Sequence, residues 1–205
     1  MKNRKALRFV MLMALALSVP ALLPAGAPTA ASGTITGKVS MAGGRNAGAA
    51  VVYIASAPGP FTPRETAEVN QRDIGFIPRV LPILVGTTVR FVNSDDVQHN
   101  VFTPSATGDF FNLGTWPKGQ SKPYTFTKMG KVELLCNVHH EMKGYILVLQ
   151  NPYFAVTDKD GNFRINNVAP GNYQLKVWHE RATATPAAVQ VSNGTQTVNF
   201  ELTAK

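Results

Sequence analysis

Cysteine is almost absent from this chain of 205 residues, which contains only Cys136. One cysteine excludes an internal disulfide framework, a four-cysteine zinc site and a Cys-x-x-Cys-His haem attachment, because each needs at least two cysteines. Charged residues are also few, at 16% against 44% hydrophobic residues, which excludes a disordered acidic chain. A sustained period of 3.6 residues is missing beyond Ser32, so a long helical or coiled-coil protein is not expected.

Acidic residues are outnumbered by basic ones, and the formal net charge is +8. The excess lies at the start of the chain, where basic residues precede an apolar run from Phe9 to Leu23 that Ser18 and Pro20 interrupt. Small residues follow as far as Ala31. This order predicts a secretory signal peptide over residues 1–31, cleaved near Ala31, with an uncleaved membrane anchor as the alternative.

Removal of residues 1–31 leaves 16 Lys and Arg against 12 Asp and Glu, a net charge of +4. These basic residues are scattered rather than clustered, so nucleic-acid binding is not expected. No cysteine stands at the predicted cleavage site, which excludes a lipid anchor on a mature N-terminal cysteine. We therefore expect an exported, periplasmic protein with no stable membrane insertion after cleavage.

Beyond residue 31 the pattern predicts an all-β protein. Alternating and β-branched runs recur between turn residues, and the chain holds 17 Gly and 14 Pro. Their spacing is typical of sandwiches or barrels. The expected strands are 34–39, 50–54, 74–78, 80–84, 88–93, 100–103, 121–126, 130–136, 144–149, 153–157, 162–166, 171–177, 187–191 and 195–202.

Residues 71–149 contain the side chains with the most specific chemistry. His99 stands alone, and Cys136-x2-His139-x2-Met142 follows 37 residues later in a predicted loop between two strands. A thiolate, two imidazoles and a thioether suit copper in both oxidation states, because soft sulfur stabilises Cu(I) while imidazole also suits Cu(II). The loop ligands can converge on one point only if a distant strand supplies the fourth, and we expect His99 on the other side of the sandwich. A rigid β framework would then keep the site similar in both oxidation states, which favours electron transfer.

With these motifs, residues 71–149 resemble a small cupredoxin of the plastocyanin and amicyanin type. The resemblance implies one copper ion held by His99, Cys136 and His139, with Met142 axial. It also implies that Asn100 ties the ligand loops together, faces Asn137 and points its amide N–H at the thiolate.

His140 stands where relatives often have proline, which leaves open whether His139 or His140 ligates. The spacing of the family loop favours His139. His140 then lies beside the site, at the surface where partners would dock.

The flanks resemble a second family. The hairpins Thr157-Asp158-x-x-Gly161-x-Phe163 and Pro170-Gly171-x-Tyr173-x-Leu175 are similar to the carboxypeptidase regulatory-like, transthyretin-related β-sandwich, and residues 36–54 resemble its opening strands. We therefore predict that residues 32–56 and 150–205 form one discontinuous sandwich, with a cupredoxin domain over 57–149 inserted between them. The alternative is two separate sandwiches in tandem.

The combined order resembles exported methylamine-utilisation-type proteins. This resemblance implies an electron carrier between periplasmic redox proteins such as a cytochrome c or an oxidising dehydrogenase. The alternatives are copper delivery or sensing without electron transfer, and an adhesion or assembly protein. An enzyme is not expected, because four protein ligands leave no open position on the metal for a substrate.

Three further polar residues receive no role at this point. Asp95 and Asp96 are interpreted as ordinary turn residues before a loop. His179 has no companions at ligand spacing and is interpreted as a surface or core residue.

Overall fold

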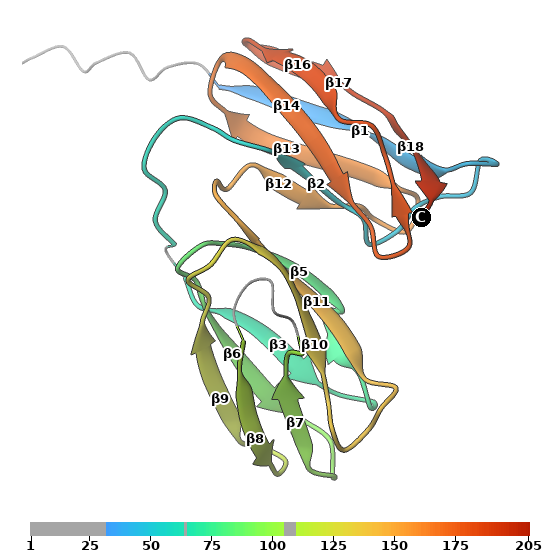
Figure 1. Cartoon of the computed structure of the whole chain (residues 1–205). Helices are drawn as coiled ribbons and strands as arrows, with labels where there is room; N and C mark the ends of the chain where they lie inside the picture. Colours follow the sequence, from blue (N-terminus) through green and yellow to red (C-terminus); the bar gives the residue numbers. More distant parts are fainter. Residues whose placement is uncertain (1–31, 64, 105–109) are drawn as a thin grey trace, which may run out of the picture.

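The computed structural model describes residues 32–63, 65–104 and 110–205, and the predicted signal peptide lies outside these residues. Within these ranges strands are the only long regular elements, and they form two β-sandwiches (Figure 1). The prediction of an all-β fold is confirmed. No helix in the described part of the chain is long and apolar enough to cross a membrane.

The first sandwich, drawn mainly in green and yellow, is built from the middle of the chain (Figure 1). One sheet has the order β5 (Val80–Leu84), β11 (Lys143–Leu149), β10 (Gly130–Leu135), β7 (His99–Phe102) and β8 (Asn112–Trp116). The other has the order β4 (Phe76–Ile77), β3 (Ala67–Gln71), β6 (Thr88–Asn93) and β9 (Ser121–Thr125). Alternate residues of these strands, such as Val132 and Leu134 of β10, fill the buried core between the sheets.

The second sandwich takes its strands from both ends of the described chain. One sheet has the order β13 (Asn162–Val168), β1 (Gly33–Met41), β18 (Phe200–Ala204) and β15 (Ala182–Thr183), with β17 (Gly194–Thr197) also paired to β1. The other has the order β12 (Phe154–Val156), β2 (Val51–Ile54), β14 (Gly171–Trp178) and β16 (Ala187–Val191). In Figure 1 the blue β1 therefore lies among orange and red strands.

Several strands differ from the sequence-based expectation. The segments that form β3, β8 and β15 are not among the expected strands, because they are short and mix polar residues or Gly with few β-branched ones. The expected strand 74–78 shortens to β4, since Asp73 and Ile74 adopt positive φ angles of 54° and 53° in the preceding turn. The expected strand 195–202 divides into β17 and β18, both parallel to β1.

Apolar and charged side chains join the two sandwiches. Val51 of the second sandwich forms a buried cluster with Val80, Tyr145 and Leu147 of the first. The Tyr145 ring contacts the Trp178 ring edge-to-face at 5.0 Å between centroids. Tyr145 also belongs to the strand that follows the predicted ligand loop, so this contact links the second sandwich to the base of that loop.

Thr157 ties the N-terminal strands of the second sandwich to its C-terminal strands. Its buried hydroxyl donates to the carbonyl of Ala47 at 2.6 Å and accepts from the N–H of Ala50 at 2.9 Å. The two partners lie more than 100 residues earlier in the chain. Substitution of Thr157 therefore tests how much these contacts between the N-terminal and C-terminal strands stabilise the second sandwich.

We predict that Thr157→Val lowers the free energy of unfolding by about 1–3 kcal/mol, because it leaves a buried N–H and a buried carbonyl unpaired. Denaturant unfolding measures the change. Thr195→Val, at an exposed position of β17, is the matched control and should stay within about 0.5 kcal/mol of the wild type. Equal losses in the two variants would contradict the role of the Thr157 hydroxyl.

Candidate metal centre

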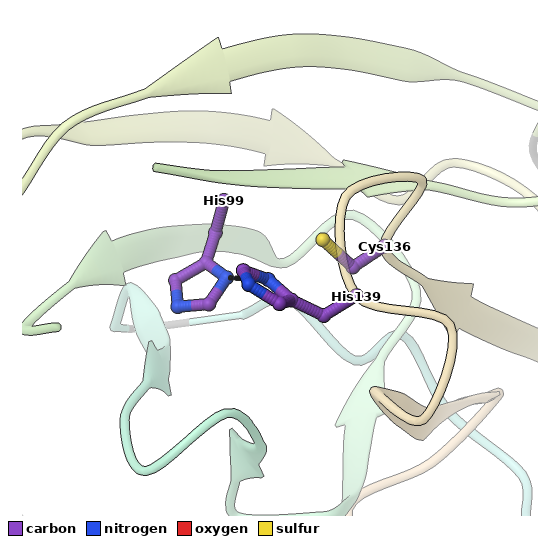
Figure 2. Close-up of side chains that lie close together, drawn as sticks. All are labelled: His99, Cys136 and His139. Atoms are coloured by element: carbon purple, nitrogen blue, oxygen red, sulfur yellow. Dashed lines mark hydrogen bonds between the residues drawn. The ribbon is translucent and has the colours of Figure 1, made fainter. Parts of the chain in front are cut away.

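His99 opens β7 and is fully buried. Its Nε2 lies 2.8 Å from Oδ2 of Asp95. An ionised carboxylate can only accept, so this contact places a proton on Nε2 and leaves the lone pair of Nδ1 free in the neutral ring. The free lone pair is on the side of the ring that faces His139 (Figure 2).

Cys136 and His139 come from the loop between β10 and β11. Cys136 directly follows β10 and is buried, and His139 is half-buried. Nδ1 of His139 lies 3.1 Å from Nδ1 of His99. The Cys136 sulfur and the nearest ring nitrogens all lie within 4.8 Å of one another, and the three side chains converge on one region (Figure 2).

The sequence-based expectation that His99 lies on the other side of the sandwich from Cys136 is wrong. β7 pairs with β10 in one sheet, through Phe102 and Leu135. His99 and Cys136 are therefore on neighbouring strands, and the ligand loop folds over the end of this sheet. The spacing in sequence is long because other strands intervene in the chain between β7 and β10.

Asn100 connects the strand to the loop. Its backbone N–H points at the Cys136 sulfur at 3.4 Å, and its Oδ1 accepts from the backbone N–H of Asn137 at 3.4 Å. Its Nδ2 donates to Oδ1 of Asn112 at 2.9 Å and to the carbonyl of Gly114 at 3.0 Å. These contacts fix the position of the thiol relative to β7.

Met142 and His140 lie on the same loop, whereas His179 does not. Met142 is buried in the same apolar cluster as Cys136, and its N–H donates to the carbonyl of His139 at 3.1 Å. His140 is exposed and is not one of the three residues that converge. His179 lies just after β14 in the second sandwich. Ligation by Met142, and the choice of His139 over His140, stay predictions.

Asp95 has a larger part in the site than an ordinary turn residue. Besides His99, its carboxylate accepts from the N–H of Asp73 at 2.8 Å and of Ile74 at 3.0 Å. Burial by itself raises the pKa of Asp95, but the Ile74 N–H, the His99 ring and the Asp73 N–H outweigh it and hold the pKa below its ordinary value. The only signal in the sequence is the Asp-x3-His spacing, which many turns share.

The donor set fits a transition-metal ion. Two imidazole Nδ1 atoms 3.1 Å apart need a proton between them, since two lone pairs at this distance would repel. A metal cation can replace that proton, with the thiolate as a third donor. Soft sulfur with imidazole favours copper or zinc over oxygen-seeking ions such as magnesium or calcium.

Comparisons with known proteins give one family match and partial matches to solved structures. The carboxypeptidase regulatory-like domain family matches residues 145–203. A copper-containing nitrite reductase from Thermus scotoductus SA-01 is 30% identical over 48% of this chain and 25% of its own, with a TM-score of 0.41. An oxidised amicyanin variant is 26% identical over 40% of this chain and 81% of its own, with a TM-score of 0.39. A purple cupredoxin from Nitrosopumilus maritimus is 26% identical over 40% of this chain and 98% of its own, with a TM-score of 0.36.

No curated protein matches the chain. The strand order nevertheless confirms the predicted fold class of an all-β protein with two β-sandwiches, and the family match includes the C-terminal strands of the second sandwich.

We predict that Asp95→Ala weakens binding of Co(II), used as a spectroscopic probe, by about 10- to 100-fold, because His99 loses the partner that orients its ring. Titration of the thiolate-to-cobalt absorption measures the affinity. Asp96→Ala is the matched control, since the side chain of Asp96 is 89% exposed and pairs only with Lys118, whereas that of Asp95 is 15% exposed. Equal affinities in the two variants would contradict the positioning role of Asp95.

Proposed function

We propose that the chain is an exported type 1 copper protein that carries single electrons between periplasmic redox partners. The observation that carries the proposal is the convergence of one cysteine sulfur and two imidazole nitrogens within 4.8 Å in the first sandwich. This combination suits both Cu(I) and Cu(II). Export depends on the signal peptide predicted over residues 1–31.

In this proposal Nδ1 of His99, Nδ1 of His139, the Cys136 sulfur and the Met142 thioether would hold one copper ion. When bound, copper would supply one-electron redox chemistry, because this ligand set suits both Cu(I) and Cu(II). Asn100 directs its N–H at the sulfur and so stabilises the charge of the thiolate. Asp95 keeps the proton of His99 on Nε2, which leaves Nδ1 available to the metal.

The burial of these residues supports electron transfer rather than catalysis on the metal. His99, Cys136 and Met142 are buried, and only His139 is half-buried. Four protein ligands shielded in this way leave no open position for a substrate, which is why we propose a carrier and not an enzyme. The outer edge of His139 is then the natural exit for the electron.

Three exposed apolar residues lie on segments that carry or contact the proposed ligands, and they support docking of a redox partner. Val138 precedes His139 in the ligand loop, and Val97 lies on the loop that leads into β7. Ile74 lies on the turn that Asp95 contacts. Scattered apolar residues on a surface need no explanation, but a group beside one ligand suits a transient partner such as a cytochrome c or an oxidising dehydrogenase.

Copper delivery or sensing is the second candidate. The half-buried His139 and the exposed His140 are adjacent at the loop surface, where an acceptor protein could reach the metal. A delivery protein has the same ligands but releases its metal. Retention of copper therefore separates the two functions.

We predict an intense visible thiolate-to-copper band on titration with Cu(II), saturating at one copper per chain. Cys136→Ser should abolish the band, because the charge transfer needs the thiolate. His139→Ala should abolish it or weaken it strongly, while His140→Ala is the matched control and should retain it. Weak or absent binding in the wild type would overturn the proposal, and loss of the band in His140→Ala alone would reverse the ligand assignment.

We also predict that the copper-loaded protein survives repeated reduction and reoxidation in the presence of a Cu(I) chelator. The visible band should disappear and return with its full intensity, because buried ligands retain the metal in both states. Absorption at the band maximum and copper content after gel filtration provide the measurement. Transfer of the copper to the chelator in the reduced state would favour delivery over electron transfer.

A further inference from the structure

The second sandwich contains a cavity of about 430 Å³, and none of the proposed metal ligands lines it. Its walls come from the loop between β1 and β2, the segment after β14 and the end of β18. The polar side chains that line it belong to Arg45, Asn46, His179 and Arg181. None of the lining residues is acidic.

The two arginines are not neutralised by the protein. In the described part of the chain, neither Arg45 nor Arg181 takes part in an ion pair. Glu180 is adjacent in sequence, but its carboxylate oxygens accept from Arg79 at 2.5 Å and from the Tyr145 hydroxyl at 3.0 Å, in the contact with the first sandwich. The carboxylate closest to the cavity in sequence is thus engaged elsewhere.

Asp158 is engaged as well. The β1–β2 loop passes the hairpin that holds it, but its carboxylate accepts from the backbone N–H groups of Asp160 and Asn162 inside its own turn. No side-chain carboxylate of the described residues therefore forms an ion pair with the two guanidinium groups of the cavity.

His179 adds a neutral donor to these charges. Its Nδ1 accepts the backbone N–H of Arg181 at 3.3 Å, so the neutral ring carries its proton on Nε2. Burial lowers the pKa of His179, and the charges of Arg181 and Lys205 lower it further, against an opposite effect of Glu180. Positive potential of this kind disfavours another cation and favours an anion.

Lys205 holds the segment that carries two of these side chains. Nζ of Lys205 donates to the backbone carbonyl of His179 at 3.0 Å, and its N–H donates to the carbonyl of Arg181 at 3.2 Å. These bonds hold the segment from His179 to Arg181 against the end of β18. His179 and Arg181 are thus attached to a backbone that is hydrogen-bonded to the end of the chain's last strand.

We propose that this cavity binds an oxyanion, a carboxylate or a phosphate group, held by the guanidinium groups of Arg45 and Arg181 and by the Nε2–H of His179. The planar fork of an arginine donates two parallel hydrogen bonds to such a group. The site is separate from the metal centre and does not depend on copper. Glu180, which lies between His179 and Arg181 in sequence, belongs to the contact that joins the two sandwiches.

The test is a titration of the metal-free chain with inorganic phosphate and, separately, with acetate, at constant ionic strength set with chloride. NMR follows the side-chain N–H signals of Arg45, Arg181 and His179. We expect saturable shifts confined to these residues, and the tighter of the two ions identifies whether phosphate or carboxylate is the preferred group. Shifts that rise linearly without saturation, for both ions, would overturn the proposal.

Variants distinguish binding at this cavity from nonspecific attraction of anions to the positive charge of the protein. Arg45→Gln and Arg181→Gln each should weaken the binding at least tenfold, and both positions are exposed, so the fold should tolerate them. Arg164→Gln, an exposed arginine on β13 that donates to Asn166, removes the same charge from the same sandwich and should leave the affinity unchanged. Equal affinities in Arg164→Gln and Arg181→Gln would contradict the site. Failure of copper binding would not affect any of these results.

Discussion

The hydrogen bonds of Asn100 hold the two parts of the metal centre together. The residue is fully buried, and its backbone and side chain contact the Cys136 sulfur, the Asn137 N–H, Asn112 and Gly114. Its carbonyl also accepts from Nε2 of Gln71, which brings in the opposite sheet. A buried amide with all its groups paired tolerates little movement, because each broken bond would leave an unpaired polar group in the core. The geometry of the ligands follows from this constraint.

A second chain of contacts leads from the ligand loop to the other sandwich. Tyr145, three residues after Met142, packs on Trp178 and donates to Glu180, which also pairs with Arg79. The same segment continues to His179 and Arg181 at the proposed anion site. The regulatory-like sandwich is therefore attached at the base of the loop that carries three of the four proposed ligands. It contacts the strand that follows this loop and also carries the proposed anion site.

The sequence predicted those features that depend on local pattern. The Cys-x2-His-x2-Met spacing and the two Gly-containing hairpins are local, and the resemblance to both families rests on them. The role of Asp95 was not predictable from the sequence. Its carboxylate accepts from the backbone N–H groups of Asp73 and Ile74, which adopt positive φ angles in a turn more than 20 residues earlier and contact Asp95 only in the folded chain. The cavity between Arg45 and Arg181 joins residues far apart in sequence, and no pattern along the chain connects them. The placement of His99 depended on strand pairing in the same way.

The central claim is that His99, Cys136 and His139 hold one copper ion together. X-ray absorption spectroscopy at the copper edge of the loaded protein tests it most directly, because it identifies the donor atoms around the metal. The account predicts one short sulfur ligand and two imidazole nitrogens, in the Cu(I) and the Cu(II) forms alike. A shell of nitrogen and oxygen atoms without sulfur would contradict it.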